Sequence, residues 1–412
     1  MVSAGSGFSP DEYARRQKAI RERMSQTGLD GLLITNPENI FYLIGLDHMG
    51  YFAPQFLLFP VKQPPVLITR AMEWAVVRDQ VPNIAHIGYD DGRASAGDAA
   101  DTTIPPFVTR RLGHRPSPEP SAAVDASIRA IHEAGLDASA IAVDQHSSYL
   151  PYGIAEGIFS RTPQVDWQNM GSVVDDVRLI QSEQELAFTR RAARISDEMI
   201  SAATHEARPG THLQNIMAGV YDASFRGGGT YPGFVPLVRT DDNLLHEHGT
   251  WQDSSLTEDN TLFLEMSGCV HRYHAPIGRL MRFGPRNASV CRANEICQQA
   301  QQAAADTLRD GVMAGDVYEA WQDVLNKNGL ERYSRHHCGY TVGIGYPPSW
   351  SGGGVPMGLR RGSQLKLRSG MVFHLMSWLL GSAPGHGFLS DTVVVTENGC
   401  DFLTTINRNV LR

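Results

Sequence analysis

The sequence predicts an α/β domain in residues 1–178 followed by an α+β domain in residues 179–412. The chain is too long for one ordinary core, because a domain usually has about 100–200 residues. In the first part, helical and strand patterns alternate, which is typical of a partly parallel sheet with helices packed on it. In the second part, long helical stretches are separated from pairs of adjacent strands. The change in pattern places the boundary at residue 178.

The predicted first domain begins with an amphipathic helix from Pro10 to Gly28. Asp11 and Glu12 lie in its first turn, where the helix dipole favours acidic side chains, and Gly28 is a typical helix end. The other elements expected here are strands at residues 31–35, 65–69 and 140–144 and a helix at residues 121–134.

The predicted second domain begins with one long helix at residues 178–207, which Pro209 and Gly210 terminate. Residues 259–283 have the pattern of a strand, a short turn and a second strand. The other elements expected here are helices at residues 288–311 and 316–329 and strands at residues 371–380 and 391–395.

Composition excludes several classes of partner. The net charge is −8 and no Lys/Arg-rich run occurs, so nucleic acid and anionic membranes are not expected partners. No apolar run reaches the length of about 18–20 residues that a membrane helix needs, and the N-terminus lacks the apolar segment of a secretory signal. The five cysteines are irregularly spaced without a CxxC pair, which argues against disulfides and structural zinc. Reduced thiols in a cytoplasmic protein fit this pattern best.

Glu265 is the strongest single candidate for a catalytic residue. It follows the apolar run Leu262–Leu264, which should be a buried strand. A carboxylate in that setting has a raised pKa and is suited to act as a general base or a nucleophile. Two structural alternatives stay open. Glu265 could be a strand-end residue facing solvent, or it could form an ion pair with Arg272 or Arg279.

Histidines gather in the second domain, at positions 246, 248, 271, 274, 336, 337 and 374. Their spacing matches no zinc motif, and most histidines of this kind are surface or core residues. On a strand, His336 and His337 would point to opposite faces. The glycines of residues 339–345 lack the strand, turn and helix order of a phosphate loop. The Gly-rich segment 226–234 is either a simple connection or the rim of a pocket.

Two segments resemble one enzyme family, that of creatinase, prolidase and aminopeptidase P. Residues 13–46 resemble its N-terminal domain, and residues 177–199 resemble the segment that opens its catalytic domain. The resemblance continues to Gly399. It implies the pita-bread (creatinase-like) fold in the second domain, a curved antiparallel sheet backed by helices with the active site inside the curve. It also implies a small-molecule substrate and a homodimer, or a higher oligomer built from dimers.

The peptidases of this family hold metal ions with two Asp, one His and two Glu. The resemblance places these positions on Glu265, Pro276, Tyr340, Met376 and Ser390. Four of the five residues cannot coordinate a hard divalent cation in the usual way. The resemblance therefore implies a member without a metal or other cofactor.

Creatinase is a metal-free member, and its catalytic histidine falls on His248. The two glutamates that bind guanidinium in creatinase are not kept here. Further segments resemble ectoine hydrolases, another metal-free group. These segments are Tyr231-Pro232, His248 to Trp251, Phe263 to Arg279, Gly339 to Trp350 and Phe373 to Met376. The segment His336-His337-Cys338 departs from that group.

The resemblance thus implies a metal-independent hydrolase of a C–N bond in an amidine or cyclic amidine, with ectoine ring opening as the leading case. Glu265 would be the nucleophile or base, and His248 would carry the proton. The expected substrate-binding residues are Tyr231, Trp251, Arg272, His274, Arg279, His337, Tyr340, Tyr346 and Trp350. The alternatives are a creatinase-like amidinohydrolase, a Xaa-Pro metallopeptidase and a binding protein without catalysis.

Overall fold

The computed structural model describes residues 7–90, 120–284, 288–352, 357–381 and 385–408. The chain divides into two compact units, Met1–Arg178 and Leu179–Arg412. Within the described residues, none of the helices combines the length and the apolar character needed to cross a membrane.

The first unit is an α/β domain with a mixed six-stranded sheet of order β4-β3-β2-β1-β5-β6. The pairs β3–β4, β1–β5 and β5–β6 are parallel, and β1–β2 and β2–β3 are antiparallel. The strands are β1 (Gly31–Ile34), β2 (Phe56–Pro60), β3 (Val66–Arg70), β4 (Ala85–Tyr89), β5 (Ala140–Val143) and β6 (Asp166–Asn169). The helices are α1 (Pro10–Thr27), α2 (Pro37–Ile44), α3 (Trp74–Gln80), α5 (Pro120–Glu133), α6 (Tyr152–Arg161) and α7 (Ser172–Arg178).

Local sequence explains where α1 begins and ends. The Ser9 hydroxyl accepts a hydrogen bond from the Glu12 amide at 3.2 Å, and Pro10 occupies the first turn. Gly28 ends the helix in the left-handed conformation, with φ of 72°. The prediction for this helix is confirmed.

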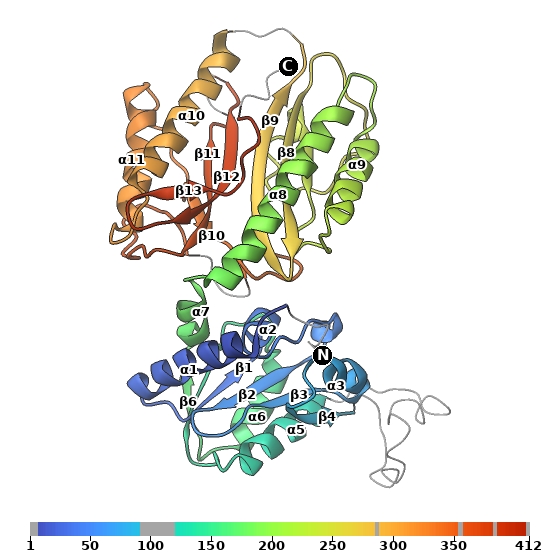
Figure 1. Ribbon diagram of the computed structural model, residues 1–412, viewed down its shortest axis with the longest axis vertical. Helices are drawn as coiled ribbons and strands as arrows, with labels where there is room; N and C mark the ends of the chain where they lie inside the picture. The colour runs from blue at the N-terminus through green and yellow to red at the C-terminus, as the bar shows by residue number, and fades with distance from the viewer. Residues whose placement is uncertain (1–6, 91–119, 285–287, 353–356, 382–384, 409–412) are drawn as a thin grey trace. The chain divides into compact units, whose positions relative to one another are not determined.

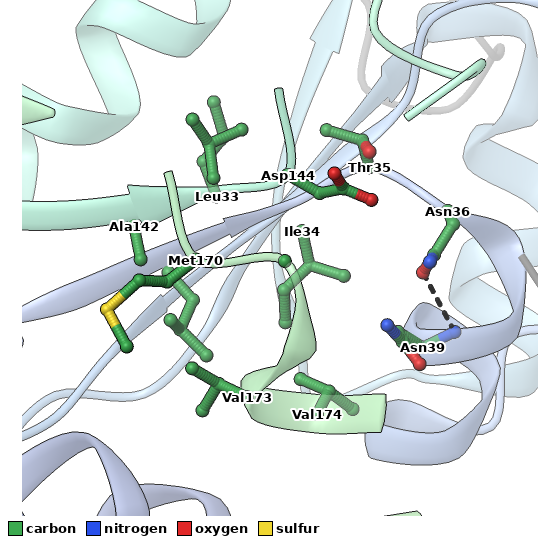
Figure 2. A pocket seen from close by; sticks show the side chains of 13 residues that line it. Leu33, Ile34, Thr35, Asn36, Asn39, Ala142, Asp144, Met170, Val173 and Val174 are labelled. Atoms are coloured by element: carbon green, nitrogen blue, oxygen red, sulfur yellow. Dashed lines mark hydrogen bonds between the residues drawn. The ribbon is translucent and has the colours of Figure 1, made fainter. Parts of the chain in front are cut away.

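A small hollow in the first unit lies beside β1, β5 and the start of α7 (Figure 2). Next to it, the Asn36 side chain caps α2 by accepting a hydrogen bond from the Asn39 amide at 3.2 Å. The hollow measures about 20 Å³, which is room for about one water molecule. It is too small to hold a substrate.

The second unit is an α+β domain built on a seven-stranded sheet, in which β10-β11-β12-β9-β8-β7 are neighbours in that order and β13 pairs with β12. Every pairing is antiparallel. The strands are β7 (Leu237–Thr240), β8 (Thr261–Val270), β9 (Tyr273–Arg282), β10 (Gly339–Thr341), β11 (Val372–Trp378), β12 (Phe388–Val395) and β13 (Cys400–Phe402). The helices are α8 (Glu183–Glu206), α9 (Leu213–Arg226), α10 (Ala288–Thr307) and α11 (Ala314–Lys327).

The long helix predicted at residues 178–207 is present as α8, Glu183–Glu206, but it begins five residues later than predicted. Helix α7 ends at Arg178, and α8 begins at Glu183. Ser182 and Glu185 form a capping box, in which the Ser182 hydroxyl accepts from the Glu185 amide and the Glu185 carboxylate accepts from the Ser182 amide. This reciprocal pair starts a new helix.

Helices pack on one face of the second sheet, and Figure 1 shows α8 running along β8 and β9. Leu262, Leu264 and Met266 of β8 share a buried cluster with apolar residues of α8 and α9. Neighbouring residues of a strand point to opposite faces, so Phe263 and Glu265 face away from these helices. That opposite face carries the candidate site.

Candidate active site

A cavity of about 400 Å³ lies over the face of the second sheet that points away from the helices. This volume suits a small organic ligand. The residues that line it are Phe234, Leu237, Glu247, His248, Glu265, His336, His337, Tyr340, Ser349, Trp350, Ser351, Gly358, Arg360, Met376 and Trp378.

Strand register brings one row of residues across the floor of this cavity. Glu265 lies opposite Leu237 on β7 and Gly278 on β9. Gly278 lies opposite Ser390 on β12, and Ser390 lies opposite Met376 on β11. Because paired residues of adjacent strands share a face, these side chains point the same way. Glu265 is therefore the one carboxylate of the row.

Glu265 lies in the middle of β8 and is only 5% exposed, so the strand-end alternative is wrong. Burial raises the pKa of its carboxyl to about 7, with the Arg239 charge lowering the pKa and the Glu247 charge raising it. His374 Nδ1 lies 3.9 Å from Glu265 Oε1. The ion pair suggested with Arg279 does not form, because that guanidinium binds Asp391. A carboxyl with this pKa can act as a base or a nucleophile near neutral pH.

Tyr340 and Trp350, both predicted site residues, lie together at the cavity wall. The Trp350 indole donates from Nε1 to the Tyr340 hydroxyl at 2.9 Å. His374 Nδ1 lies 3.2 Å from the same hydroxyl, and His374 Nε2 lies 2.7 Å from Ser390 Oγ. Burial, together with the Glu265 charge, raises the pKa of Tyr340, so the phenol keeps its proton.

His248 lies in the loop that leads into β8, and its exposed ring lines the cavity. Its ring centroid is 5.9 Å from that of Phe234. The adjacent Glu247 forms an ion pair with Arg335, whose guanidinium lies 4.0 Å above the Trp378 ring. The loop is thereby tied to the cavity wall.

His336 and His337 precede β10, and they do not point to opposite faces. Both line the cavity, with ring centroids 4.1 Å apart. Burial, with the neighbouring charges of His336 and Arg335, lowers the pKa of His337 to about 3. Its Nδ1 is buried and has no hydrogen-bond partner in the described part of the chain.

Arg279 does not line the cavity, although we expected it to bind substrate. Its guanidinium donates to Asp391 Oδ1 at 2.8 Å and to the Ser390 carbonyl at 2.6 Å. Both members of this ion pair are 1% exposed. The Arg279 side chain therefore links β9 to β12.

Arg272, Tyr231 and Tyr346 also lie outside the cavity lining. The Arg272 guanidinium lies 3.9 Å from the Tyr231 ring centroid and 5.0 Å from that of Tyr346. Arg272 is in the turn between β8 and β9, with φ of 66°, and is buried. The three residues form a cation–π cluster of their own.

His274 and Trp251 likewise hold neighbouring segments. His274 Nε2 accepts from the Gly233 amide at 2.7 Å, and Nδ1 lies 3.2 Å from the Gly343 carbonyl. Burial and the Arg272 charge lower the pKa of His274 to about 3. Trp251 is 41% exposed and donates to the Pro236 carbonyl at 2.7 Å. Neither residue lines the cavity.

The segment 226–234 does contribute a cavity residue, Phe234, because its chain passes very close to Ser349. A Cβ atom on Gly233 would lie 2.2 Å from the Ser349 carbonyl oxygen. Only glycine permits this approach. Sequence reasoning did not select Arg360 or His374. Strand alternation could have found His374, which lies two residues before Met376 on the same face.

Comparisons with known proteins place the whole chain in one group. Residues 187–397 match metallopeptidase family M24, and residues 16–180 match the creatinase/prolidase N-terminal domain. The chain is 25% identical to an ectoine hydrolase of Halomonas elongata, over 100% of this chain and 99% of that protein. It is 28% identical to an uncharacterised hydrolase/peptidase of Sinorhizobium fredii, over 98% of each chain.

A prolidase structure from Thermococcus sibiricus superimposes with a TM-score of 0.80 at 18% identity, over 98% of this chain and 100% of that one. At this identity the match speaks for the fold alone. The predicted fold, an α/β domain followed by a pita-bread domain, is confirmed.

Proposed function

The chain belongs to metallopeptidase family M24, and from this premise we propose that it is a metal-independent hydrolase that opens a cyclic amidine, with ectoine as the leading substrate. The observation that carries the proposal is Glu265, a buried carboxyl with a pKa of about 7 on the floor of a substrate-sized cavity.

The residues at the family's metal positions do not fit a pair of metal ions. The resemblance places these positions on Glu265, Pro276, Tyr340, Met376 and Ser390. Register brings Glu265, Met376 and Ser390 into one row, and this row supplies a single carboxylate. Hard divalent cations need several oxygen or imidazole ligands. Across the described ranges, no three His, Cys, Asp or Glu residues are grouped to hold a metal. These residues therefore do not support a step that uses a metal ion.

An amidine needs less electrophilic help than a peptide, because its protonated form already places positive charge on the reacting carbon. As a base, Glu265 takes a proton from a water molecule whose oxygen bonds to this carbon. As a nucleophile, Glu265 bonds to the carbon with its own oxygen, and a water molecule later cleaves this covalent intermediate and restores the carboxylate. Oxygen addition gives a tetrahedral carbon bonded to one oxygen and two nitrogens. One C–N bond then breaks as its nitrogen takes a proton from His248. Net addition of one water leaves an amide and an amine in the ring-opened product.

The comparisons support this reaction class without specifying the substrate. The Halomonas protein named ectoine hydrolase matches along its whole length. The peptidase relatives share the fold, which hosts more than one chemistry. The relationship to these hydrolases favours an enzyme over a binding protein without catalysis.

Arg360 takes the place of Arg272 and Arg279 as the proposed partner of a substrate carboxylate. Among the described residues that line the cavity, it is the only Arg or Lys. Glu265 and Arg360 thus offer opposite charges to one ligand. A zwitterion with an amidinium at one end and a carboxylate at the other, such as ectoine, matches this arrangement.

Replacing Arg360 by leucine is expected to raise KM for a carboxylate-bearing amidine about tenfold or more, because a charge-assisted hydrogen bond contributes about 1.5–3 kcal/mol. The kcat should change little. Steady-state kinetics with ectoine, and with an analogue that lacks the carboxylate, would measure the effect. An equal loss with both substrates would show that Arg360 does not bind the carboxylate.

A substrate panel tests the proposed function. Purified protein is incubated separately with ectoine, hydroxyectoine, creatine and a Xaa-Pro dipeptide, and the products are identified by mass spectrometry. We expect one of the ectoines to gain the mass of one water. Cleavage of creatine would favour the creatinase-like alternative, and cleavage of the dipeptide would favour a peptidase. Binding without turnover of any compound would favour a non-catalytic homologue.

A further inference from the structure

His374 occupies a central position behind the cavity wall. It lies in β11, opposite Tyr340 on β10 and Thr392 on β12, and its side chain is fully buried. Burial lowers the pKa of His374 to about 3, so the ring is neutral and carries one hydrogen. In a neutral imidazole, one nitrogen donates and the other accepts.

The position of that hydrogen determines where the Tyr340 hydroxyl points. The phenol oxygen already accepts from Trp350 Nε1, which can only donate. If His374 Nδ1 also donates, both lone pairs of the oxygen are occupied, and the phenol hydrogen must turn to another acceptor. If Nδ1 accepts instead, the phenol donates its hydrogen to His374 and cannot donate it to a ligand in the cavity.

We propose that His374 carries its hydrogen on Nδ1, while Ser390 donates to Nε2, and that this pair holds the Tyr340 hydroxyl as a hydrogen-bond donor to the bound substrate. Two distances support this assignment. Nδ1 lies 3.9 Å from Glu265 Oε1, and an N–H there is attracted to the carboxylate, whereas a lone pair is repelled. Nε2 lies 2.7 Å from Ser390 Oγ, and a hydroxyl can rotate to donate.

The inference rests on the proposed function and gives His374 and Ser390 a role as positioning residues. When oxygen adds to the carbon of the protonated amidine, the positive charge is lost, and negative charge density builds up on the two nitrogens. A neutral donor fixed in advance stabilises such charge in the transition state more than in the bound substrate. Tyr340 would thus supply, by hydrogen bonding, part of the stabilisation that a metal supplies in the peptidases. Tyr340 and Ser390 are two of the family's metal positions, and His374 links them.

The tautomer can be measured without a substrate. Protein labelled with ¹⁵N-histidine is studied by NMR, and the His374 signals are identified by their loss in His374→Asn. We expect the shifts of a neutral ring protonated at Nδ1. A ring protonated at Nε2 would overturn the proposal. Because no turnover is needed, this result stands or falls independently of the proposed function.

Kinetics then separate a positioning role from a structural one. Tyr340→Phe should lower kcat about 100-fold or more with little change in KM, as loss of a transition-state donor does. His374→Leu should lower kcat by a similar factor, while His374→Asn, which keeps an amide group near the place of Nδ1, should recover at least about tenfold of that loss.

The double variant provides the decisive comparison, because the effects of substituting two residues on the activation free energy do not add when one residue acts through the other. In the Tyr340→Phe background, His374→Leu should lower kcat by no more than about twofold. If kcat of the double variant instead falls by the product of the two single-variant factors, His374 acts only on the fold, and the proposal is overturned. Thermal unfolding of each variant shows whether it is folded. If His374→Leu does not fold, the tautomer measurement on the unaltered chain tests the proposal by itself.

Discussion

Replacing Glu265 by glutamine is expected to lower turnover at least about a thousandfold, because the amide can neither attack the amidine carbon nor accept a proton from water. KM should change less than kcat. In the unaltered protein, kcat/KM should rise with pH through about 7, as the Glu265 carboxylate of the free enzyme forms. A matched control is Glu258→Gln, an exposed residue near the start of the same strand, which should leave kcat unchanged.

The same substitution should stabilise the protein at high pH. The folded state holds the Glu265 proton up to a pKa of about 7, whereas the ordinary value is 4.5. Between these values the folded state keeps a proton that the unfolded state has lost, so stability falls as pH rises through this window. Glutamine does not ionise, so the variant does not lose this stability as the pH rises. Glu265→Gln should therefore gain about 2–3 kcal/mol over the parent protein between pH 5 and pH 8.

Thermal unfolding of both proteins at pH 5 and pH 8 checks this second effect. If Glu265→Gln loses activity and gains stability at pH 8, the Glu265 carboxylate serves catalysis and does not stabilise the fold. If Glu265→Gln instead destabilises the protein equally at both pH values, Glu265 is a structural residue, and the proposed mechanism is wrong.

Replacing Arg279 by leucine is expected to destabilise the second unit by about 3–5 kcal/mol, because removing one member of a buried ion pair leaves the other charge uncompensated. Asp391 would retain hydrogen bonds from Gln301 and Thr404. It would lose its closest cation, and the carbonyls of Gly278 and Ser390 would lose a donor.

The effect should appear as a fall of about 6–20 °C in the thermal unfolding midpoint, with KM unchanged in the protein that remains folded. Arg360→Leu is the matched comparison, and it should show the reverse: a raised KM and an unchanged midpoint. A raised KM in Arg279→Leu without a lower midpoint would return Arg279 to the substrate-binding role that the sequence suggested.

The sequence was sufficient for the elements whose signals are local. Ser9 and Gly28 mark both ends of α1, and the apolar pattern of residues 259–283 marks the paired strands β8 and β9. The start of α8 was predicted five residues too early because the helical pattern continues across residues 178–182, and the capping box of Ser182 and Glu185 was not used.

The sequence selected Glu265 from its buried strand, and the family resemblance selected the other site residues that line the cavity. Glu265, His248, Tyr340, Trp350 and His337 all line one cavity. The arginines were misplaced for a different reason, since their partners are distant in sequence: Asp391 binds Arg279 across 112 positions. Only the register of β9 with β12 brings that pair together. Arg360 was missed because no local pattern marks a cavity rim.

Turnover of ectoine by metal-stripped protein tests the central claim most directly. Protein is treated with a chelator, its residual metal is measured by mass spectrometry, and kcat is compared before and after addition of Mn²⁺ or Zn²⁺. We predict ring opening at the same kcat in all samples, lost only in Glu265→Gln. Activity that disappears with the metal and returns on its addition would contradict the account.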